Sequence, residues 1–259
     1  MKIKIDKTAI IKEPVYIGKN VSIGAYSIIG PNVKIGNNNY IDSHVIIKGK
    51  TIIGNNNKFF SFSQIGVEPQ CKNDIYLNNK LIIGNNNIFR ECTSIHKGTT
   101  RNNGTTFIGN NNYLMVNSHI AHDCLIKNNI VFSNGASAAG HVTIDSFVTI
   151  SGFVGINQYT HIGKYSFATG GTIIRKDVLP YVIVSGYPAK TKSINVIGLK
   201  RRNFNIETIT NLKKIYRLIF NTTHTIPNIL IKLNGLKDNI KEKNIIINFL
   251  KSSKHGITR

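Results

Sequence analysis

The sequence predicts an all-β left-handed parallel β-helix followed by a small C-terminal α-helical domain. Two observations predict the β-helix: an aliphatic residue recurs at every sixth position through most of residues 1–190, and Gly follows it at many repeats. A third observation predicts the second domain, because the pattern changes after Asn195 to the three-four apolar spacing of an amphipathic helix. We therefore divide the chain into residues 1–190 and 191–259.

The six-residue period runs in two phases. The first phase is carried by Ile17, Ile23, Ile29, Ile35, Ile41, Ile47 and Ile53, and it returns at Ile65 and Ile83. The second phase holds without slippage from Ile108 to Ile174. Phe89 still fits the first phase, but the step from Phe89 to Ile108 exceeds three repeats by a single position, so the phase breaks there. We expect loop excursions near residues 96–106, where Gly and Asn cluster, and near residues 68–80.

The period has a simple physical reason. A six-residue unit makes one short strand and one tight turn, and three such units close a triangular coil whose aliphatic side chains stack inside. The segments 36–39, 54–57, 84–87 and 109–112 all read Gly-Asn-Asn-Asn. We expect their glycines and asparagines to adopt the left-handed turn conformation, which these residues tolerate. Residues three repeats apart then lie one above another, about 4.8 Å apart, like neighbouring strands.

The C-terminal region predicts three helices. Apolar residues follow one helical face from Ile206 to Phe220, with Asn205 as a cap and Glu207 in the first turn. Two shorter helices are expected near residues 227–233 and 238–251. Residues 191–259 hold 14 Lys/Arg and 3 Asp/Glu, a net charge of +11, and are too few for a large core. We expect them to pack on the end of the β-helix or on a neighbouring subunit.

The whole chain carries a formal charge of +21. One interpretation is a polyanion-binding protein, and the other is a compositional bias, because Ile, Asn and Lys are frequent everywhere. The lysines are scattered and form no nucleic-acid-binding signature. We therefore expect no nucleic acid as a partner, and instead acidic partners such as phosphates or an acidic carrier protein.

The distribution of apolar residues and cysteines bears on location. No apolar run reaches the roughly 18 residues that a membrane span needs, so we expect no stable membrane insertion. The first residues lack the continuous apolar segment of a secretory signal. Three cysteines at irregular spacing indicate a reducing, cytoplasmic location.

Polar residues interrupt the repetitive wall in adjacent coils. They are His119, His122, Asp123, Gly140, His141 and Gln158. The three-repeat coil places His122 beneath Gly140, and Gly140 beneath Gln158. Three histidines in register with a carboxylate point to a functional site. Three histidines could hold a metal ion, but neighbouring positions on a strand and turn point in divergent directions, so we expect no metal ion here. We also expect no cofactor.

General-base catalysis fits this cluster. A neutral His122 imidazole can take a proton from a hydroxyl or an amine, and Asp123 can hold the ring and stabilise its charged form. The backbone amide of Gly140, with no side chain in the way, can stabilise an oxyanion. The alternative for Gly140 is an ordinary turn glycine. A base and an oxyanion donor suit direct acyl transfer from an activated thioester, without a Ser or Cys nucleophile.

Five segments carry a resemblance to known proteins: 114–124, 139–142, 195–204, 95–98 and 177–182. Together they resemble one family, the acyl-carrier-protein-dependent UDP-N-acetylglucosamine O-acyltransferases of lipid A biosynthesis. The resemblance covers essentially the whole chain. It implies a homotrimer with active sites between neighbouring β-helices. It also implies transfer of a 3-hydroxyacyl group from acyl carrier protein to the 3-hydroxyl of UDP-N-acetylglucosamine, in the first step of lipid A biosynthesis.

The resemblance also implies roles for particular residues. His122 is the general base, Asp123 its orienting partner and Gly140 the oxyanion donor. The substrate-binding residues that it implies are His119, His141, Gln158, Gln70, Asn195, Arg201, Arg202 and Gly170. Among these, the two arginines and Asn195 would face the nucleotide and its phosphates, which suit bidentate guanidinium contacts. The alternative for the arginines is a solvated charge run, and Gly170 falls where the family sets acyl length.

The chain departs from the family pattern at three places: Asn157, where the family has His; Ile197, where it has Glu; and the loop 70–73. None of these departures touches the base, its Asp or the glycine. Two other functions stay open at this point. One is an N-acyltransferase of the same repeat class that acts on an amino-sugar nucleotide, and the other is a non-catalytic scaffold that binds polyanions.

Overall fold

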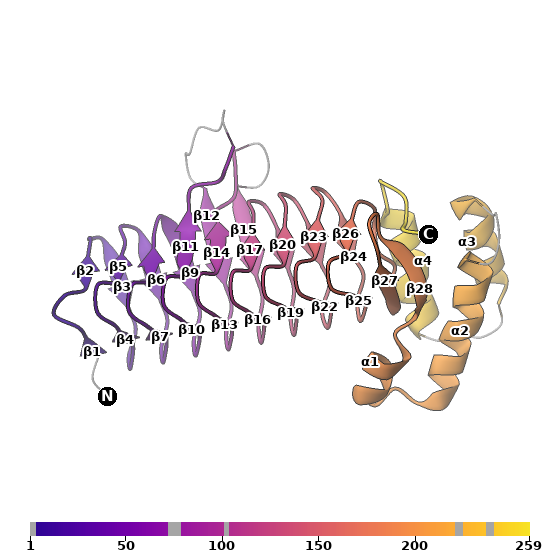
Figure 1. The fold of residues 1–259 in the computed structure, drawn as a ribbon, viewed down its shortest axis with the longest axis horizontal. Helices are drawn as coiled ribbons and strands as arrows, with labels where there is room; N and C mark the ends of the chain where they lie inside the picture. The colour runs from indigo at the N-terminus through magenta and orange to yellow at the C-terminus, as the bar shows by residue number, and fades with distance from the viewer. Residues whose placement is uncertain (1–3, 72–78, 101–103, 221–224, 237–240) are drawn as a thin grey trace.

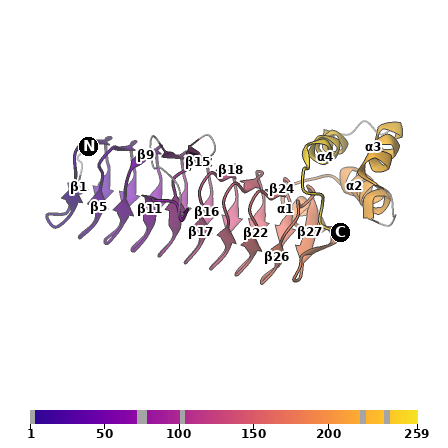
Figure 2. The same cartoon turned by 90° about the horizontal axis from the view of Figure 1, so that it is seen from above.

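The computed structural model describes residues 4–71, 79–100, 104–220, 225–236 and 241–259. It confirms a left-handed parallel β-helix that carries helices at one end (Figure 1). Seen from above, the coils lie side by side along a straight rod, with the helices beyond the last coil (Figure 2). Three sheets of eleven, nine and eight strands form the walls of the rod.

The bounds of the strands follow the repeat. The eleven-stranded sheet contains β1 (Lys4–Ile5), β4 (Ser22–Ile23), β7 (Tyr40–Ile41), β10 (Lys58–Phe59), β13 (Ile88–Phe89), β16 (Tyr113–Leu114), β19 (Val131–Phe132), β22 (Thr149–Ile150), β25 (Phe167–Ala168), β27 (Val182–Ser185) and β28 (Lys190–Ile194). The nine-stranded sheet contains β2 (Ile10–Ile11), β5 (Ile28–Ile29), β8 (Ile46–Ile47), β11 (Gln64–Val67), β14 (Ser94–His96), β17 (His119–Ile120), β20 (Ser137–Ala138), β23 (Gly155–Ile156) and β26 (Ile173–Ile174). The eight-stranded sheet contains β3 (Val15–Ile17), β6 (Val33–Ile35), β9 (Lys50–Ile53), β12 (Lys80–Ile83), β15 (Thr105–Ile108), β18 (Leu125–Ile126), β21 (Thr143–Ile144) and β24 (His161–Ile162).

The register confirms the three-repeat coil. Ile120 pairs with Ala138, and in the eight-stranded sheet Ile53 pairs with Ile83 and Ile83 with Ile108 across the excursions. The first excursion adds two whole repeats to its coil and keeps the phase. The second adds one repeat and a single further position, and this changes the phase. Both are narrower than expected, because His96 and Lys80 already belong to strands. Residues 72–78 and 101–103 lie outside the described residues.

The second residue of each short strand points into the rod and builds the core. Ile29, Ile47 and Ile65 are fully buried in one column of the nine-stranded sheet. Phe59 and Phe89 stack with ring centroids 4.8 Å apart in the eleven-stranded sheet. Because each inward side chain packs on the same position of the next coil, burial continues along the rod from Ile23 onward, while Ile5 in the first coil is 43% exposed.

The expectation for the repeated glycines was wrong. The left-handed residue of each Gly-Asn-Asn-Asn turn is the second asparagine, as at Asn38 and Asn56, both with φ 58°. Gly36 is needed for another reason: a Cβ there would lie 2.6 Å from the carbonyl oxygen of Gly54 in the next coil. The first asparagine links the coils, since Asn55 Oδ1 accepts a 2.7 Å hydrogen bond from the N–H of Asn37. Close backbone approach, rather than a positive φ, therefore selects glycine here.

The helices begin directly after Asn195, where the sequence pattern changes, whereas β28 runs past the proposed domain boundary. β28 ends at Ile194, so the boundary at residue 190 cuts through a strand that pairs antiparallel with β27. The helices are α1 (Val196–Arg201), α2 (Ile206–Phe220), α3 (Ile226–Gly235) and α4 (Lys241–Ser252). Three of them agree with the expected helices, whereas the short α1 had no apolar period to reveal it.

The C-terminal segment returns to the β-helix. The N–H of Thr258 donates a 2.8 Å hydrogen bond to the carbonyl oxygen of Asp177, whose carboxylate accepts from the Ser253 hydroxyl at 2.7 Å. These contacts hold the end of the chain beside the last coils and fix where His255 lies. Among the described residues, no helix combines the length and the apolar character needed to cross a bilayer.

Candidate active site

The site forms along one corner of the rod, where the chain turns from the nine-stranded to the eight-stranded sheet. Asp123, His141 and Tyr159 occupy the same position in three successive turns, each with φ between 58° and 62°. The His141 and Tyr159 rings stack with centroids 4.5 Å apart. The N–H of His141 donates a 3.0 Å hydrogen bond to the carbonyl oxygen of His122. The stacking expected from the three-repeat coil is therefore present.

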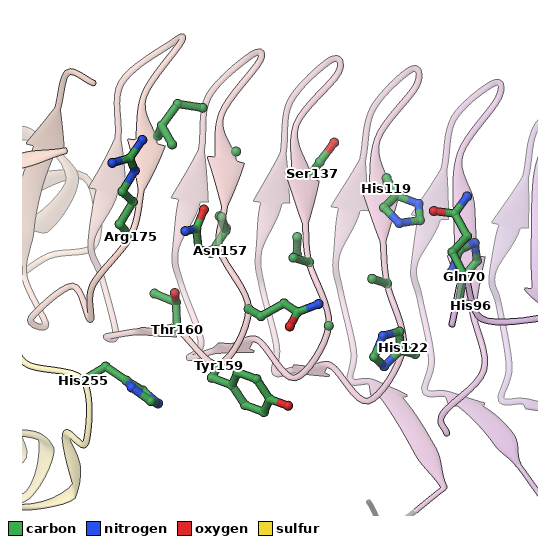
Figure 3. A pocket seen from close by; sticks show the side chains of 18 residues that line it. Gln70, His96, His119, His122, Ser137, Asn157, Tyr159, Thr160, Arg175 and His255 are labelled. Carbon is green, nitrogen blue, oxygen red and sulfur yellow. The ribbon is translucent and has the colours of Figure 1, made fainter. Parts of the chain in front are cut away.

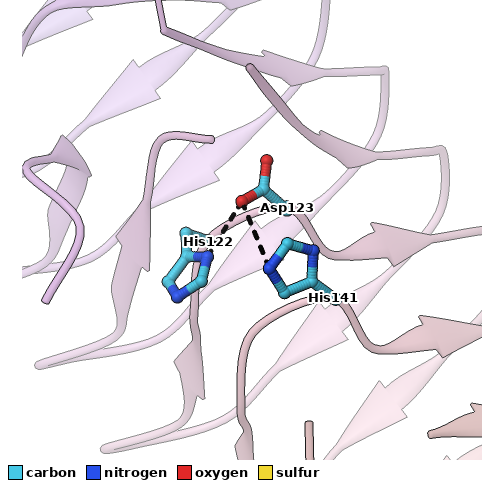
Figure 4. Close-up of side chains that lie close together, drawn as sticks. All are labelled: His122, Asp123 and His141. Atoms are coloured by element: carbon cyan, nitrogen blue, oxygen red, sulfur yellow. Dashed lines mark hydrogen bonds and ion pairs between the residues drawn. The ribbon is translucent and has the colours of Figure 1, made fainter. Parts of the chain in front are cut away.

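His122 and Asp123 form a hydrogen-bonded pair. His122 Nδ1 lies 2.9 Å from Asp123 Oδ2, and their side chains are 12% and 0% exposed (Figure 4). An ionised carboxylate only accepts hydrogen bonds, so Nδ1 carries the proton and Nε2 presents its lone pair. His141 Nε2 lies 3.8 Å from the same oxygen. This arrangement suits a base that acts through Nε2.

Gly140 lies against the free edge of the His122 ring. A Cβ added to Gly140 would lie 2.5 Å from His122 Cε1 and 2.7 Å from Nε2. Only glycine therefore leaves this ring in place. Gly140 is buried rather than exposed, yet it lines the groove described next, and its N–H donates no hydrogen bond among the described residues. An unpaired N–H beside the base is suited to an oxyanion.

A groove of about 780 Å³ runs along the nine-stranded sheet from this pair toward the C-terminal end. His96, His119, Gln70 and His122 lie at one end of it, and Arg175 and His255 lie at the other (Figure 3). Its remaining lining residues are Ala121, Ser137, Ala138, Ala139, Gly140, Gly155, Ile156, Asn157, Gln158, Tyr159, Thr160 and Ile173.

A smaller pocket of about 500 Å³ adjoins the groove at the corner. Gln70, His122, Gln158 and Tyr159 line both cavities, and His141 lines the smaller one. The groove is long and has apolar as well as polar lining residues, whereas the corner pocket is lined mainly by polar side chains. The two cavities therefore suit a chain and a polar group that meet at His122. Gln70 and Gln158 thus lie with the base, as expected.

The three histidines do not converge on one point. His119 Nδ1 bonds the Ser94 hydroxyl at 2.8 Å, and its ring packs edge-on against His96 with centroids 4.8 Å apart. His122 and His141 instead meet at Asp123. His119 and His96 lie on strands and face the groove. His122 and His141 lie in turns and face the corner pocket. The site is therefore two adjoining groups rather than a single cluster.

Burial makes His96, His119 and His141 weaker bases. It is the largest cause of the shift that lowers the pKa of His96 to about 4, and the neighbouring His119 and His122 contribute to the same shift. Burial also lowers the pKa of His119 and of His141, although the Asp123 carboxylate opposes the effect at His141. These rings are neutral at pH 7, so they offer substrate one donor and one acceptor each without adding charge.

We expect the low pKa of His96 to make the protein less stable in weak acid. Above its ordinary pKa of 6.5 the ring is neutral whether the chain is folded or not. Between pH 6.5 and about 4 the unfolded chain binds a proton that the folded chain excludes, so the free energy of unfolding falls as the pH falls. His96→Asn should flatten this slope in urea titrations at several pH values. The exposed His255→Asn is the control for losing one histidine, and equal slopes for wild type and His96→Asn would contradict the expectation.

The residues expected at the nucleotide lie elsewhere in this chain. Asn195, Arg201 and Arg202 line a third pocket of about 570 Å³, together with Phe147 and Tyr165. Asn195 caps α1 by accepting a 3.1 Å hydrogen bond from the N–H of Gly198. The Arg202 guanidinium lies 4.5 Å above the centre of the Phe147 ring. This pocket borders the eleven-stranded sheet, so one chain does not bring it to His122.

Gly170 lies in the turn between β25 and β26 and is not among the described residues that line the groove. A Cβ there would meet its nearest atom, the carbonyl oxygen of Gly152, at 3.5 Å, which is an ordinary contact. Its role in acyl length stays a prediction. Gly155 and Ile173 of β23 and β26 line the groove instead, and Gly155 keeps that stretch of it open.

Sequence reasoning missed several residues of the site, of which His96, Thr99, Arg175 and His255 carry polar side chains. His96 ends β14 and Thr99 follows it. Because the excursion interrupts the six-residue period there, the period could not predict which residues of the next coil they meet. Arg175 begins the segment after β26, and His255 reaches the groove only through the fold of the C-terminal segment. The sequence could have indicated His96, because it directly follows the inward-pointing Ile95 at the end of a strand and lies just before the loop. Nothing in the pattern placed His255.

His122, Asp123 and His141 are also the group among the described residues that could hold a metal ion. One ligand atom from each lies within 4.8 Å of the others. The hydrogen bonds to Asp123 account for the same geometry, because its Oδ2 already accepts from His122 and from Thr99. The expectation that no metal takes part stays a prediction.

Known proteins share both the sequence and the fold. The family described as UDP N-acetylglucosamine O-acyltransferase, domain 2, matches residues 177–258. An acyl-[acyl-carrier-protein]–UDP-N-acetylglucosamine O-acyltransferase of Syntrophobacter fumaroxidans is 41% identical over 257 residues, which is 99% of this chain and 100% of that protein. The UDP-N-acetylglucosamine O-acyltransferase structure from Moraxella catarrhalis is 38% identical with a TM-score of 0.96, covering 98% of this chain and 99% of that chain. The Francisella novicida acyltransferase structure is 34% identical with a TM-score of 0.93, covering 98% and 94%.

The fold and the site therefore define an acyltransferase of the hexapeptide-repeat class. Both the β-helix and the C-terminal helices take part in the similarity, since it spans nearly the whole of each chain. The chain belongs to the acyl-[acyl-carrier-protein]–UDP-N-acetylglucosamine O-acyltransferase family, which confirms the resemblance carried by residues 114–124 and 195–204.

Proposed function

We propose that this protein transfers a 3-hydroxyacyl group from acyl carrier protein to the 3-hydroxyl of UDP-N-acetylglucosamine, the first step of lipid A biosynthesis. Full-length identity of 41% to a relative named for this activity supports the reaction. The observation that carries the mechanism is the pair formed by His122 and the buried Asp123 at 2.9 Å, beside the N–H of Gly140, which donates no hydrogen bond within the described part of the chain. The long groove suits an acyl chain, and the polar corner pocket suits a sugar.

The reaction needs one proton taken and one returned. His122 Nε2 removes the proton of the sugar hydroxyl while its oxygen attacks the thioester carbonyl carbon. Asp123 stabilises the imidazolium that forms, and the Gly140 N–H stabilises the oxyanion. When the C–S bond breaks, the imidazolium returns the proton to the thiolate of the carrier. The ester, the free thiol and a neutral His122 remain.

We infer that the protein works as a homotrimer in the cytoplasm. Tyr26, Phe62 and Phe153 lie at the corner between the eleven- and nine-stranded sheets and are 60%, 57% and 76% exposed. Tyr26 and Phe62 stack on either side of His44, and Phe153 lies farther along the same corner. Exposed rings of this kind favour burial against other copies. The pocket with Asn195, Arg201 and Arg202 would then face the groove of a neighbouring chain, where the two arginines would bind the phosphates of the nucleotide.

A comparison of two acceptors tests the substrate. We expect UDP-N-acetylglucosamine to be acylated with a kcat/KM at least about tenfold above that of its 3-amino analogue, a factor worth about 1.4 kcal/mol. The acceptors are assayed side by side with one 3-hydroxyacyl carrier protein. A clear preference for the amine would reject the O-acyltransferase and favour an N-acyltransferase. Salt-sensitive nucleic-acid binding without any transfer would favour the scaffold instead.

A further inference from the structure

The loop that follows β14 reaches across to the carboxylate behind the base. Thr99 belongs to the second excursion, well before Asp123 in the sequence. Its N–H donates to both carboxylate oxygens, at 3.0 Å to Oδ1 and 3.1 Å to Oδ2. Its hydroxyl donates a 2.6 Å hydrogen bond to Oδ2. One residue of the loop therefore holds both oxygens of Asp123.

These contacts are sealed from solvent. Thr99 is 1% exposed, and the side chain of Asp123 is 0% exposed. The oxygen that takes the Thr99 hydroxyl is the same Oδ2 that takes His122 Nδ1. A buried charge needs several donors, and hydrogen bonds to a carboxylate are among the stronger ones. The two donors of Thr99 hold the Asp123 carboxylate in the orientation in which Oδ2 faces the His122 imidazole.

The turn itself is held by a different threonine. Thr106 of β15 is 0% exposed, and its Oγ1 accepts a 2.8 Å hydrogen bond from the N–H of Asp123. Thr106 thus contacts the backbone of the turn, whereas Thr99 contacts its carboxylate. The two residues have the same side chain, similar burial and one hydrogen bond each to Asp123 through their hydroxyls. They form a natural matched pair.

We propose that Thr99 is a positioning residue for the base, because its hydroxyl and N–H fix the Asp123 carboxylate that orients His122. The proposal rests on the proposed function. Thr99 thereby becomes the third member of a hydrogen-bonded chain, Thr99–Asp123–His122. In this chain a residue of the second excursion supports the catalytic base. Thr99 itself exchanges no proton with the substrate.

The test is Thr99→Val, which keeps the shape and removes the hydroxyl. We expect kcat to fall about tenfold, the factor that about 1.4 kcal/mol corresponds to, with the KM for UDP-N-acetylglucosamine unchanged. Thr99→Ser keeps the hydroxyl and should retain most of kcat. Thr106→Val should leave kcat within about twofold of wild type even if it lowers the thermal midpoint.

Three outcomes would overturn the proposal. They are an unchanged kcat in Thr99→Val, an equal fall of kcat in Thr106→Val, and a Thr99→Ser variant as slow as Thr99→Val. Including His122→Ala in the same assay tests the proposed base separately from the positioning role of Thr99. If His122→Ala is inactive while Thr99→Val is fully active, only the positioning role fails. If His122→Ala is active, the proposed base fails.

Discussion

Replacing His122 with alanine should lower kcat by about 10²–10⁴-fold, the contribution typical of a general base. The imidazole is the group in the groove that combines a buried carboxylate at Nδ1 with an Nε2 facing Gly140. Without it, the attacking hydroxyl loses the base that we propose for it. The rate is measured with 3-hydroxyacyl carrier protein and UDP-N-acetylglucosamine, both above their KM.

The fold should tolerate His122→Ala, so the loss is one of chemistry. His122 lies in a turn, and its ring is not part of the aliphatic core. The matched control is His161→Ala, because His161 Nε2 also pairs with a carboxylate, at 3.1 Å from Asp145 Oδ2. His161 is not among the described residues that line either cavity, so His161→Ala should keep wild-type kcat even if its thermal midpoint falls. A His122→Ala protein that turns over within about tenfold of wild type would contradict the role of the base.

Replacing Gly140 with alanine should lower kcat at least about 10²-fold, because displacing a catalytic group by about 1 Å can cost that much. The added Cβ would lie 2.5 Å from His122 Cε1, so the ring must leave its position. It would also crowd the N–H that stabilises the oxyanion. Transfer rates and thermal midpoints of Gly140→Ala and wild type are compared in parallel.

Gly152→Ala provides the control for Gly140→Ala. Gly152 lies in a turn of the same rod, and a Cβ there would meet only the carbonyl oxygen of Asn134, at 3.4 Å. The backbone of neither glycine has a positive φ, so Ala brings no backbone strain to either. Gly152→Ala should keep both activity and stability. Equal losses in the two variants would show that any side chain in these turns is harmful, and would remove the special role of Gly140.

The repeat allowed the fold and half of the site to be predicted from the sequence. A period of six fixes which residues point inward, and three units fix which residues stack. That alone placed His122 under Gly140 and Asp123 under His141, as the structure confirms. The break of phase after Phe89 located the second excursion. Such positions follow from local geometry and need no knowledge of distant contacts.

The remaining features depend on long-range contacts that no period encodes. Thr99 meets Asp123 because an excursion folds back, and His255 reaches the groove because the C-terminal segment docks on Asp177. The glycine error had a similar origin. Gly36 is selected by the carbonyl of the next coil, which is a contact between coils and not a property of its own turn.

The residues that the sequence predicts at the nucleotide do not lie beside the base in the structure of one chain. Asn195 and the two arginines lie at a pocket on a different wall of the rod from the base. Only a second chain could bring that pocket to the groove. The proposed nucleotide contacts of Asn195, Arg201 and Arg202 therefore require the proposed trimer.

The most direct test of the account is the mass of the product. Purified protein is incubated with UDP-N-acetylglucosamine and a series of 3-hydroxyacyl carrier proteins, and the nucleotide sugar is analysed by mass spectrometry. We expect a nucleotide sugar heavier by one 3-hydroxyacyl group, attached as an ester that mild alkali releases. A nucleotide sugar that stays at its starting mass with every donor would contradict it.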